Sequence, residues 1–255
     1  MPERNAVSNA VTFDFSGVTA LVTGGTSGIG HAVATAFADA GAAVTVTGTR
    51  SAPSDYPDVA LDRFTYHALD TRDADAVDRL AAGITTLDVL VNNAGANFAG
   101  GDEWDPDGFS AALACNVEGA VRLTTRLRDV LRASDLPGGA SVVNVVSMTA
   151  YRSTTIVPGY SAAKAALLAM TRNFAVHWVG DGIRVNAVAP GLVATRMTAP
   201  MHDWPELLDA ELAKAAMDRM ATPEEVAAAV LFLSSSASAY TTGAAFAVDG
   251  GYLAV

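Results

Sequence analysis

The residues best suited to move a proton lie in the second half of the chain, where Tyr160 and Lys164 are four positions apart. Side chains at this spacing share one face of a helix. A free tyrosine titrates at about pH 10, and a neighbouring ammonium group favours the ionised phenol. We therefore expect Lys164 to lower the pKa of Tyr160, so that the phenol exchanges a proton with a carbonyl or an alcohol. Taken alone, such a pair is more often an ordinary surface contact.

A hydroxyl group precedes this pair at the end of an apolar segment. Ser147 stands thirteen positions before Tyr160 and closes the β-rich run 141–147. In an open α/β sheet, the carboxyl ends of the strands form the mouth of the binding site. We therefore expect the Ser147 hydroxyl to reach the same substrate oxygen as Tyr160, although a simple turn at a strand end would use the same residue type.

A glycine-rich loop near the start of the chain has the pattern of a phosphate-binding turn. It reads Thr23-Gly24-Gly25-Thr26-Ser27-Gly28-Ile29-Gly30 and lies between the apolar run 18–22 and a helical stretch at 28–40. Without a Cβ the chain turns tightly, its N–H groups approach a pyrophosphate, and the helix packs close to the strand. The N-terminus of the following helix also favours phosphate. The loop lacks the Gly-Lys-Ser/Thr of a P-loop, which disfavours nucleotide hydrolysis.

The end of the second predicted strand bears on the choice of dinucleotide. An acid that binds the ribose of NAD is expected about 20 residues after the glycine loop, but the chain reads Gly48-Thr49-Arg50 there. Arg50 could pair with a 2′-phosphate through charge-assisted hydrogen bonds, and we therefore favour NADP(H). Because Arg50 could also be a solvated loop residue, NAD(H) stays open.

Apolar, β-rich runs alternate with Ala-rich helical stretches along most of the chain. Such repeats predict a mainly parallel sheet with helices on both faces, and apolar strands are typical of a sheet covered on both sides. We predict an α/β protein with a single-domain Rossmann-type doubly wound sheet of about seven strands over residues 15–255, preceded by a mobile extension at 1–14. Residues 191–221 depart from the pattern and are expected to form a substrate lid. The predicted strands are 18–22, 43–47, 64–68, 87–91, 141–147, 183–187 and 244–248, and the predicted helices are 28–40, 73–82, 107–133, 158–179 and 223–233.

The composition excludes several classes of function. Of the 255 residues, 51% are hydrophobic and 17% are charged, which excludes a disordered chain. A net charge of -11 argues against bulk binding to nucleic acid or to an anionic membrane. The one cysteine, Cys115, cannot form an internal disulfide, and the four histidines form no zinc-binding motif. There is no signal-peptide core and no apolar run of about 18 residues. We expect a soluble, cytoplasmic protein without a metal.

These segments together resemble the short-chain dehydrogenase/reductase family, from about Phe15 to the C-terminus. Each motif is weak alone, but their order and spacing are highly specific. The matching segments are Thr23-Gly24-x-x-x-Gly28-x-Gly30 in the cofactor loop, Asp70 after the third strand, Asn92-Asn93-Ala94-Gly95 after the fourth, Asn116 with Ser147, Tyr160 and Lys164 as a catalytic tetrad, and Pro190-Gly191 with Thr195.

The resemblance implies an oxidoreductase that transfers a hydride between a nicotinamide cofactor and a carbonyl or secondary alcohol. In this family Tyr160 would be the general acid/base, Lys164 would lower its pKa and bind the nicotinamide ribose, and Ser147 would stabilise the substrate oxygen. Asn116 would support a water in a proton relay with Lys164, although it could be a helix-kink residue, and Asn93 could simply tie strand ends together. The expected cofactor-binding residues are Gly24, Thr26, Ser27, Gly28, Ile29, Gly30, Thr49, Arg50, Asp70, Asn93, Ala94, Gly95, Tyr160, Lys164, Pro190, Gly191, Val193 and Thr195. Members of the family are usually homotetramers or homodimers.

The substrate-binding residues are the least defined by the sequence. We expect a pocket bounded by Asn97, Phe98, Met148, Thr149, Val157, Leu192 and the stretch Met197–Leu208. Most of these side chains are apolar, and the basic residues nearby are Arg152 and Arg196. We therefore predict a neutral, moderately apolar ketone or secondary alcohol as the small-molecule substrate, with ketone reduction following from the preference for NADP(H).

Two other functions fit parts of the sequence. Gly159-Tyr160-Ser161-Ala162-Ala163 is near the Gly-x-Ser-x-Gly elbow of α/β-hydrolases, but no strand precedes it and the final glycine is missing. A dinucleotide-binding regulator without catalysis is the stronger alternative, because one fold serves many functions. The intact tetrad argues against a regulator.

Overall fold

The sheet consists of parallel strands in one layer. In the computed structural model, which describes residues 11–98 and 102–254, a 7-stranded sheet has the order β3-β2-β1-β4-β5-β6-β7. The order reverses between β1 and β4, which is the switch point at which such sheets bind ligands. The strands are β1 (Thr19–Val22), β2 (Ala43–Gly48), β3 (Thr65–Ala68), β4 (Val89–Asn92), β5 (Ala140–Val145), β6 (Ile183–Pro190) and β7 (Ala245–Val248).

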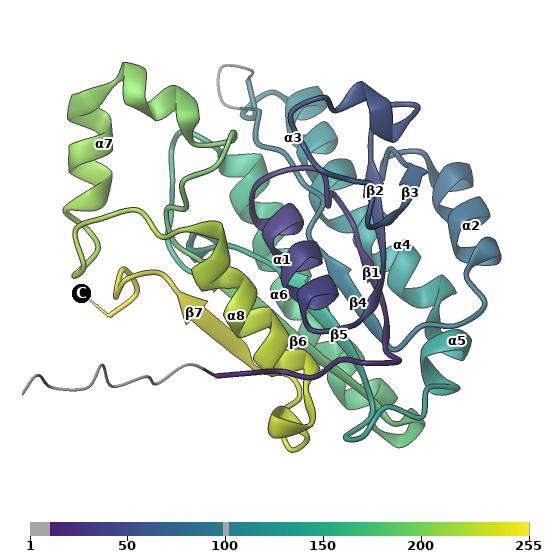
Figure 1. The fold of residues 1–255 in the computed structure, drawn as a ribbon. Coiled ribbons are helices and arrows are strands. Elements are labelled where there is room, and N and C mark those ends of the chain that lie inside the picture. Colours follow the sequence, from purple (N-terminus) through teal and green to yellow (C-terminus); the bar gives the residue numbers. More distant parts are fainter. Residues whose placement is uncertain (1–10, 99–101, 255) are drawn as a thin grey trace, which may run out of the picture.

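Helices cover both faces of this sheet (Figure 1). The helices are α1 (Gly28–Asp39), α2 (Ala74–Gly83), α3 (Pro106–Leu113), α4 (Gly119–Arg126), α5 (Arg128–Arg132), α6 (Pro158–Trp178), α7 (Pro205–Leu212) and α8 (Pro223–Ser234). α1 and α8 pack side by side on one face, over a core that includes Val22 and Val46. α2, α4 and α6 cover the other face, over a core that includes Leu21 and Leu90. Successive strand residues thus enter opposite cores, which explains why the strands are apolar throughout.

The predicted fold class, a doubly wound parallel α/β sheet of Rossmann type, is confirmed. Each predicted strand is present, with its ends displaced by no more than three residues. The helices predicted at 28–40, 73–82, 158–179 and 223–233 correspond to α1, α2, α6 and α8.

The long helical region predicted over 107–133 is present, but it is not one regular α-helix. It consists of α3, a π-helical turn at Ala114–Glu118, α4 and α5. Asn116 is buried in the π turn, where its Nδ2 donates to the carbonyl of Ala112 at 3.0 Å and to that of Ala96 at 2.8 Å. A side chain that takes a carbonyl of the preceding turn interrupts the helical hydrogen bonds. The break therefore follows from the placement of Asn116.

The segment 191–221 contains a helix that the sequence pattern did not predict. It forms the 3₁₀ turn η5 (Ala199–Asp203) and then α7, which lies at the edge of the molecule away from the sheet (Figure 1). Pro205 occupies the first position of α7, where its missing N–H is not needed. None of the residues of α7 is buried, so the segment lacks the strong apolar stripe that marks a core helix.

Some predictions fall on parts of the chain outside the described residues. Residues 1–10 of the predicted extension and residues 99–101, next to the expected substrate pocket, belong to these parts. Phe13 packs against the core, and its ring centre lies 6.2 Å from that of Phe15. Over residues 11–98 and 102–254, no helix has the length and apolar character needed to cross a membrane.

Candidate active site

A cavity of about 760 Å³ opens along the carboxyl ends of the strands, at the switch point between β1 and β4. The structure brings most of the residues predicted to bind cofactor or to act in catalysis to its wall. These are Gly24, Thr26, Ser27, Gly28, Ile29, Thr49, Arg50, Asp70, Asn93, Ala94, Gly95, Ser147, Tyr160, Lys164, Pro190, Gly191, Val193 and Thr195. Gly30 and Asn116 are buried and do not line the cavity.

The glycine loop has the backbone geometry of a phosphate cradle. Gly28 adopts a φ of 51°, a left-handed conformation that strains other residues. At Gly30 a Cβ would lie 2.3 Å from the carbonyl oxygen of Gly24 and 2.3 Å from Nδ2 of Asn93, so a larger residue does not fit. Nδ2 of Asn93 donates to the carbonyls of Thr23 and Gly24 at 3.0 and 3.2 Å. Asn93 thus ties the end of β4 to the loop, which is the alternative that the sequence left open.

The first turn of α1 is free to receive an anion. Ser27 stands at the N-cap, but its side chain caps no N–H group, and the first turn carries no acidic residue. Ser27, Gly28 and Ile29 line the cavity. The uncapped N–H groups and the partial positive charge of the helix terminus suit a pyrophosphate.

Arg50 lies at the same cavity and is stacked on an aromatic ring. Its guanidinium carbon is 4.7 Å from the centre of the Tyr56 ring, and its Nη1 donates to the carbonyl of Asp55. The backbone N–H of Arg50 donates to the Tyr56 hydroxyl at 3.0 Å. Stacking restricts the cation to this place rather than leaving it free in solvent. The sequence analysis missed Tyr56, an aromatic residue in a Pro-containing loop.

Asp70 and Arg72 form an ion pair at the cavity wall. Nη2 of Arg72 lies 2.7 Å from Oδ2 of Asp70, and both residues line the cavity. Hydrogen bonds from Arg72 lower the pKa of Asp70, so its carboxylate stays ionised. Asp70 thus stands at the cavity as the family resemblance implied, and Arg72 is a further cation that the sequence analysis missed.

Hydroxyl groups form a connected chain beside Tyr160. The Tyr160 hydroxyl is hydrogen-bonded to Ser147, and the hydroxyl and N–H of Thr149 donate to Ser147 Oγ at 3.0 and 3.1 Å. Because these bonds use the lone pairs of Ser147 Oγ, its own proton is left for Tyr160 or a substrate oxygen. Ser161 Oγ donates to the carbonyl of Thr149 at 2.6 Å. The turn that carries Ser147 is therefore fixed to the helix that carries Tyr160.

Lys164 is buried on the same helix as Tyr160 but does not act on the phenol as expected. Its Nζ lies 5.5 Å from the centre of the Tyr160 ring and donates to the carbonyl of Val145 at 2.9 Å. Burial raises the pKa of Tyr160 to about 12; the bond from Ser147 opposes this rise and the charge of Glu103 adds to it. Burial also lowers the pKa of Lys164 to about 8. The expected fall in the pKa of Tyr160 is therefore wrong for this structure, because desolvation disfavours the charged form of both groups.

Asn116 lies close to Lys164 but uses its amide on the backbone. Its Oδ1 accepts the N–H of Ala96 at 3.2 Å, while its Nδ2 donates to the carbonyls of Ala96 and Ala112. A Cβ at Gly95 would lie 2.5 Å from Oδ1 of Asn116 and 3.3 Å from Nζ of Lys164. The geometry displays the helix-kink role that the sequence left open, and a water relay to Lys164 stays a prediction.

Comparisons with known proteins agree with this geometry. The sequence family described as "Enoyl-(Acyl carrier protein) reductase" matches residues 24–253. "Galactitol 2-dehydrogenase (L-tagatose-forming)" of Cereibacter sphaeroides is 38% identical over 248 residues, which cover 94% of this chain and 96% of that protein. The chain belongs to the short-chain dehydrogenase/reductase family.

Further members of the short-chain dehydrogenase/reductase family match over nearly their full length. D-threitol dehydrogenase of Mycolicibacterium smegmatis is 34% identical, over 95% of this chain and 96% of that protein. The solved RhlG/NADP active-site complex of Pseudomonas aeruginosa has a TM-score of 0.84 at 32% identity, over 94% of this chain and 98% of that one. The expectation of an oxidoreductase that uses a nicotinamide cofactor on secondary alcohols or carbonyls is confirmed at the level of this family.

The substrate end of this short-chain dehydrogenase differs from the predicted set of residues. Asn97, Phe98 and Met197 line the cavity as expected. Four predicted members, Met148, Thr149, Val157 and Leu192, are absent from the described residues that line it. The Thr149 hydroxyl turns toward Ser147 instead. Leu192 lines a separate cavity of about 350 Å³ beside the C-terminal segment.

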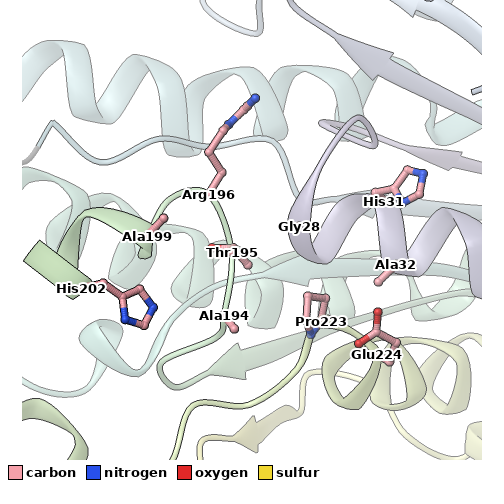
Figure 2. Close-up of a pocket in the computed structure, with 10 residues that line it drawn as sticks. All are labelled: Gly28, His31, Ala32, Ala194, Thr195, Arg196, Ala199, His202, Pro223 and Glu224. Atoms are coloured by element: carbon pink, nitrogen blue, oxygen red, sulfur yellow. The ribbon is translucent and has the colours of Figure 1, made fainter. Parts of the chain in front are cut away.

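A second cavity, of about 510 Å³, adjoins the first at the start of the predicted lid (Figure 2). Gly28, Thr195 and Arg196 line both cavities. In Figure 2, His31 on α1 and His202 on η5 lie on opposite sides of the segment that carries Thr195. Nη2 of Arg196 donates to Ser27 Oγ at 3.4 Å, so the predicted lid contacts the glycine loop through this arginine.

The sequence analysis also missed Glu103, a buried acid beside α6, the helix that carries Tyr160. Its carboxylate accepts the backbone N–H of Tyr160 at 2.9 Å. A lone acid in a loop carries no spacing signal toward a residue 57 positions away. Only the folded chain brings the two together.

Proposed function

We propose that the protein reduces a ketone to a secondary alcohol with NADP(H). The observation that carries this proposal is that Ser147, Tyr160 and Lys164 line the same cavity as Arg50 and the first turn of α1. Proton-transfer groups and groups suited to a dinucleotide thus share one space. Such a constellation is the physical requirement for hydride transfer coupled to proton transfer.

Tyr160 would supply the proton of this reaction. A pKa of about 12 keeps the phenol protonated at neutral pH, which is the form that donates to a carbonyl oxygen. The nicotinamide supplies the hydride when it is bound. Ser147, whose lone pairs are occupied by Thr149, donates to the same oxygen and stabilises its developing negative charge. Lys164 lies beside them and would bind the nicotinamide ribose.

Two arginines are placed for the phosphates of a dinucleotide, and one of them, Arg50, favours NADP(H) over NAD(H). The stacked guanidinium of Arg50 is a fork of donors that suits a 2′-phosphate. Arg196 lies over Ser27 and would offset the charge of the pyrophosphate. The similar RhlG structure from Pseudomonas aeruginosa is described as a complex with NADP. NAD(H) is the alternative, because Arg50 is exposed.

The substrate end favours a neutral molecule. Asn97, Phe98 and Met197 offer one amide and two apolar side chains. Arg50 and Arg196 lie beside the glycine loop and its neighbouring strand end, where the dinucleotide phosphates would bind. Two relatives are named for galactitol and D-threitol. Small polyhydroxy ketones therefore belong in a first substrate panel beside moderately apolar ketones.

We further propose a homotetramer or homodimer. Apolar side chains are exposed at the end of α6 and on β7, where Val176 is 80%, Val179 62% and Phe246 40% exposed. Contact with a second copy of the chain would bury them. The family resemblance supports the same arrangement.

Tyr160→Phe tests the catalytic proposal. We expect wild-type protein to oxidise NADPH with at least one ketone of the panel, and the variant to lose about 10²-fold or more of kcat, since it lacks the general acid. NADPH affinity, measured by thermal shift, should stay near the wild-type value. Tyr151→Phe removes an exposed phenol outside the cavity and is the matched control. Near-normal turnover by Tyr160→Phe would remove Tyr160 as the acid, and NADPH binding without turnover in wild type would favour the regulator.

Arg50→Asp tests the choice of cofactor. A carboxylate would repel the 2′-phosphate and accept from a ribose hydroxyl, so the affinity ratio of NADPH to NADH should fall by about tenfold or more. Titration of both cofactors by fluorescence measures this ratio. Arg132→Asp, at an exposed arginine on α5, makes the same change of charge away from the cavity. An unchanged ratio in Arg50→Asp would exclude the 2′-phosphate role.

A further inference from the structure

Glu103 is a buried acid that the chemistry proposed above does not use. Glu103 is 2% exposed and precedes α3 in the chain. One carboxylate oxygen accepts the N–H of Phe98 at 2.9 Å, and the other accepts the N–H of Tyr160 at 2.9 Å. Phe98 belongs to the cavity wall, and Tyr160 carries the phenol. One carboxylate therefore joins the backbone of two sides of the site.

The Glu103 carboxylate caps the start of α6. Val157 at the N-cap offers no side-chain acceptor, and Pro158 at the first position has no N–H. The N–H of Tyr160 is one of the four that a helix leaves unpaired at its start, and Glu103 accepts it. A Cβ on Gly159 would lie 3.3 Å from Oε2 of Glu103, so the carboxylate and the helix start are in close contact. Negative charge at this place is also favoured by the helix dipole.

Further bonds fix the backbone around Glu103. Oδ1 of Asp102 accepts the N–H groups of Trp104 and Asp105 at 2.9 and 3.2 Å. Trp104 Nε1 donates to the carbonyl of Thr155, in the loop before α6, at 3.2 Å. The carboxylate is therefore presented to Tyr160 from a segment whose own turn is closed by Asp102 and which is bonded to the loop before α6.

A helix cap alone does not require a buried charge. Burial of a carboxylate costs free energy unless hydrogen bonds compensate for it, and a serine or asparagine at position 157 would cap α6 locally. Glu103 instead binds one N–H from the cavity wall and one from the helix, 57 positions along the chain. Because each carboxylate oxygen of Glu103 binds a different segment, Glu103 fixes the separation between the cavity wall at Phe98 and the start of α6.

We propose that Glu103 is a positioning residue, which sets the place of the Tyr160 phenol relative to the Phe98 wall by binding the backbone N–H of both residues. This inference rests on the proposed function, since it gives Glu103 a part in the proton transfer by Tyr160. Glu103 does not line the cavity, so it acts through Tyr160 and not on the substrate.

Amide hydrogen exchange tests the link without any substrate. In Glu103→Gln an NH₂ group replaces one acceptor oxygen, so one of the two N–H groups loses its partner. We expect the amide of Phe98 or Tyr160 to exchange about tenfold faster, while the amide of Leu167 in the middle of α6 stays unchanged. Asp107→Asn, at an exposed acid on α3, is the control. Unchanged exchange at both amides in Glu103→Gln overturns the proposal.

Kinetics tests the consequence for the phenol. Glu103→Gln should lower kcat about tenfold or more without changing NADPH affinity, because a displaced acid costs rate and not binding. In alcohol oxidation the rising limb of the pH profile should move to lower pH, because loss of the Glu103 charge lowers the pKa of Tyr160. Two other titratable groups face this place. Lys164 faces Tyr160 from the same helix, and the charge of Cys115 in the π turn raises the pKa of Lys164; both residues are unchanged in the variant.

Glu103→Asp separates charge from reach. It keeps the charge but is shorter by one methylene, so we expect a lower kcat with the pH limb in its wild-type position. A limb that stays in place in Glu103→Gln, with kcat reduced only in proportion to folded protein, would show a merely structural role and overturn the proposal. If Glu103→Gln does not fold, Glu103→Asp carries the same exchange and kcat test.

The two proposals fail in different ways. Normal kcat in Tyr160→Phe overturns the proposed function, whatever Glu103 does. Normal kcat in Glu103→Gln, in protein whose Tyr160→Phe variant is inactive, overturns the positioning role alone.

Discussion

Lys164 on α6 and Arg184 on β6 are both buried cations, but their surroundings differ. Arg184 is 6% exposed and Lys164 3%, so burial does not separate them. Near the amino end of β6, Arg184 donates to backbone carbonyls of Gly138, Leu233, Ser235, Ser238 and Thr241. Near the carboxyl end of β5, Lys164 has one acceptor among the described residues, the carbonyl of Val145 at 2.9 Å.

The difference lies in the donors that remain. A guanidinium has five N–H donors and an ammonium group has three. The chain offers acceptors to Nε and to both Nη atoms of Arg184, so this cation joins β6 to Gly138 and to the segment 233–241 at the amino edge of the sheet. Lys164 lines the cavity, and only one of its three donors has an acceptor among the described residues. A buried cation with spare donors at a cavity is a better indicator of function than burial itself.

Replacing each cation by methionine should break this comparison most clearly. Arg184→Met leaves several carbonyls without a donor, so we expect the free energy of unfolding to fall by about 3–5 kcal/mol. Lys164→Met removes a buried charge that has one acceptor, so stability should change by less than about 1 kcal/mol or increase. Urea unfolding followed by circular dichroism measures both. Arg172→Met, at an exposed arginine on α6, is the control.

Cofactor binding should give the opposite order for the same two variants. Folded Arg184→Met should bind NADPH as wild type does, whereas Lys164→Met should bind it more weakly, because the spare donors are lost. Equal losses of stability in the two variants would contradict the distinction between a cation whose donors are bonded to the chain and a cation that has donors to spare.

The carboxyl edge of the sheet, where Lys164 lies, and the amino edge, where Arg184 lies, also differ in how well the sequence predicted their contacts. At the carboxyl edge, the glycine loop and the pair of Tyr160 with Lys164 each lie within one turn or one helix, so spacing alone indicates which residues meet. The acceptors of Arg184 lie 46 to 57 positions away in the chain. No local pattern signals such contacts, and the sequence analysis did not identify Arg184.

Within the site, the sequence predicted placement better than electrostatics. The spacing of Tyr160 and Lys164 indicates a shared helix face but not the depth of burial, which decides both pKa shifts. The roles of Asn116 and Glu103 depend on backbone groups far along the chain, to which neither residue is related by a period. The helix α7 was missed because none of its residues is buried.

The protonation of Lys164 gives a further, smaller difference between Lys164 and Arg184, in how the free energy of unfolding depends on pH. Its pKa is about 8 in the folded protein, against 10.5 for an ordinary lysine. Between these values the unfolded chain binds more protons than the folded chain, so the free energy of unfolding should rise with pH. We expect a rise of about 1–2 kcal/mol from about pH 8 to pH 10, relative to Lys164→Met. Arg184 keeps its proton throughout, so Arg184→Met should retain the rise.

Urea unfolding at several pH values in this window measures the effect as a difference between two proteins. Burial raises the pKa of Cys115, which makes stability fall with pH in both proteins. The charge of Lys164 partly offsets this shift, so the fall in Lys164→Met is at least as large and does not imitate the rise expected in wild type. Tyr160, with its pKa raised to about 12, opposes the rise above about pH 10, which sets the upper end of the window. Equal pH slopes in wild type and Lys164→Met would mean that the ammonium is as well satisfied as the guanidinium of Arg184. Spare donors would then no longer distinguish Lys164 at the cavity from Arg184 at the amino edge of the sheet.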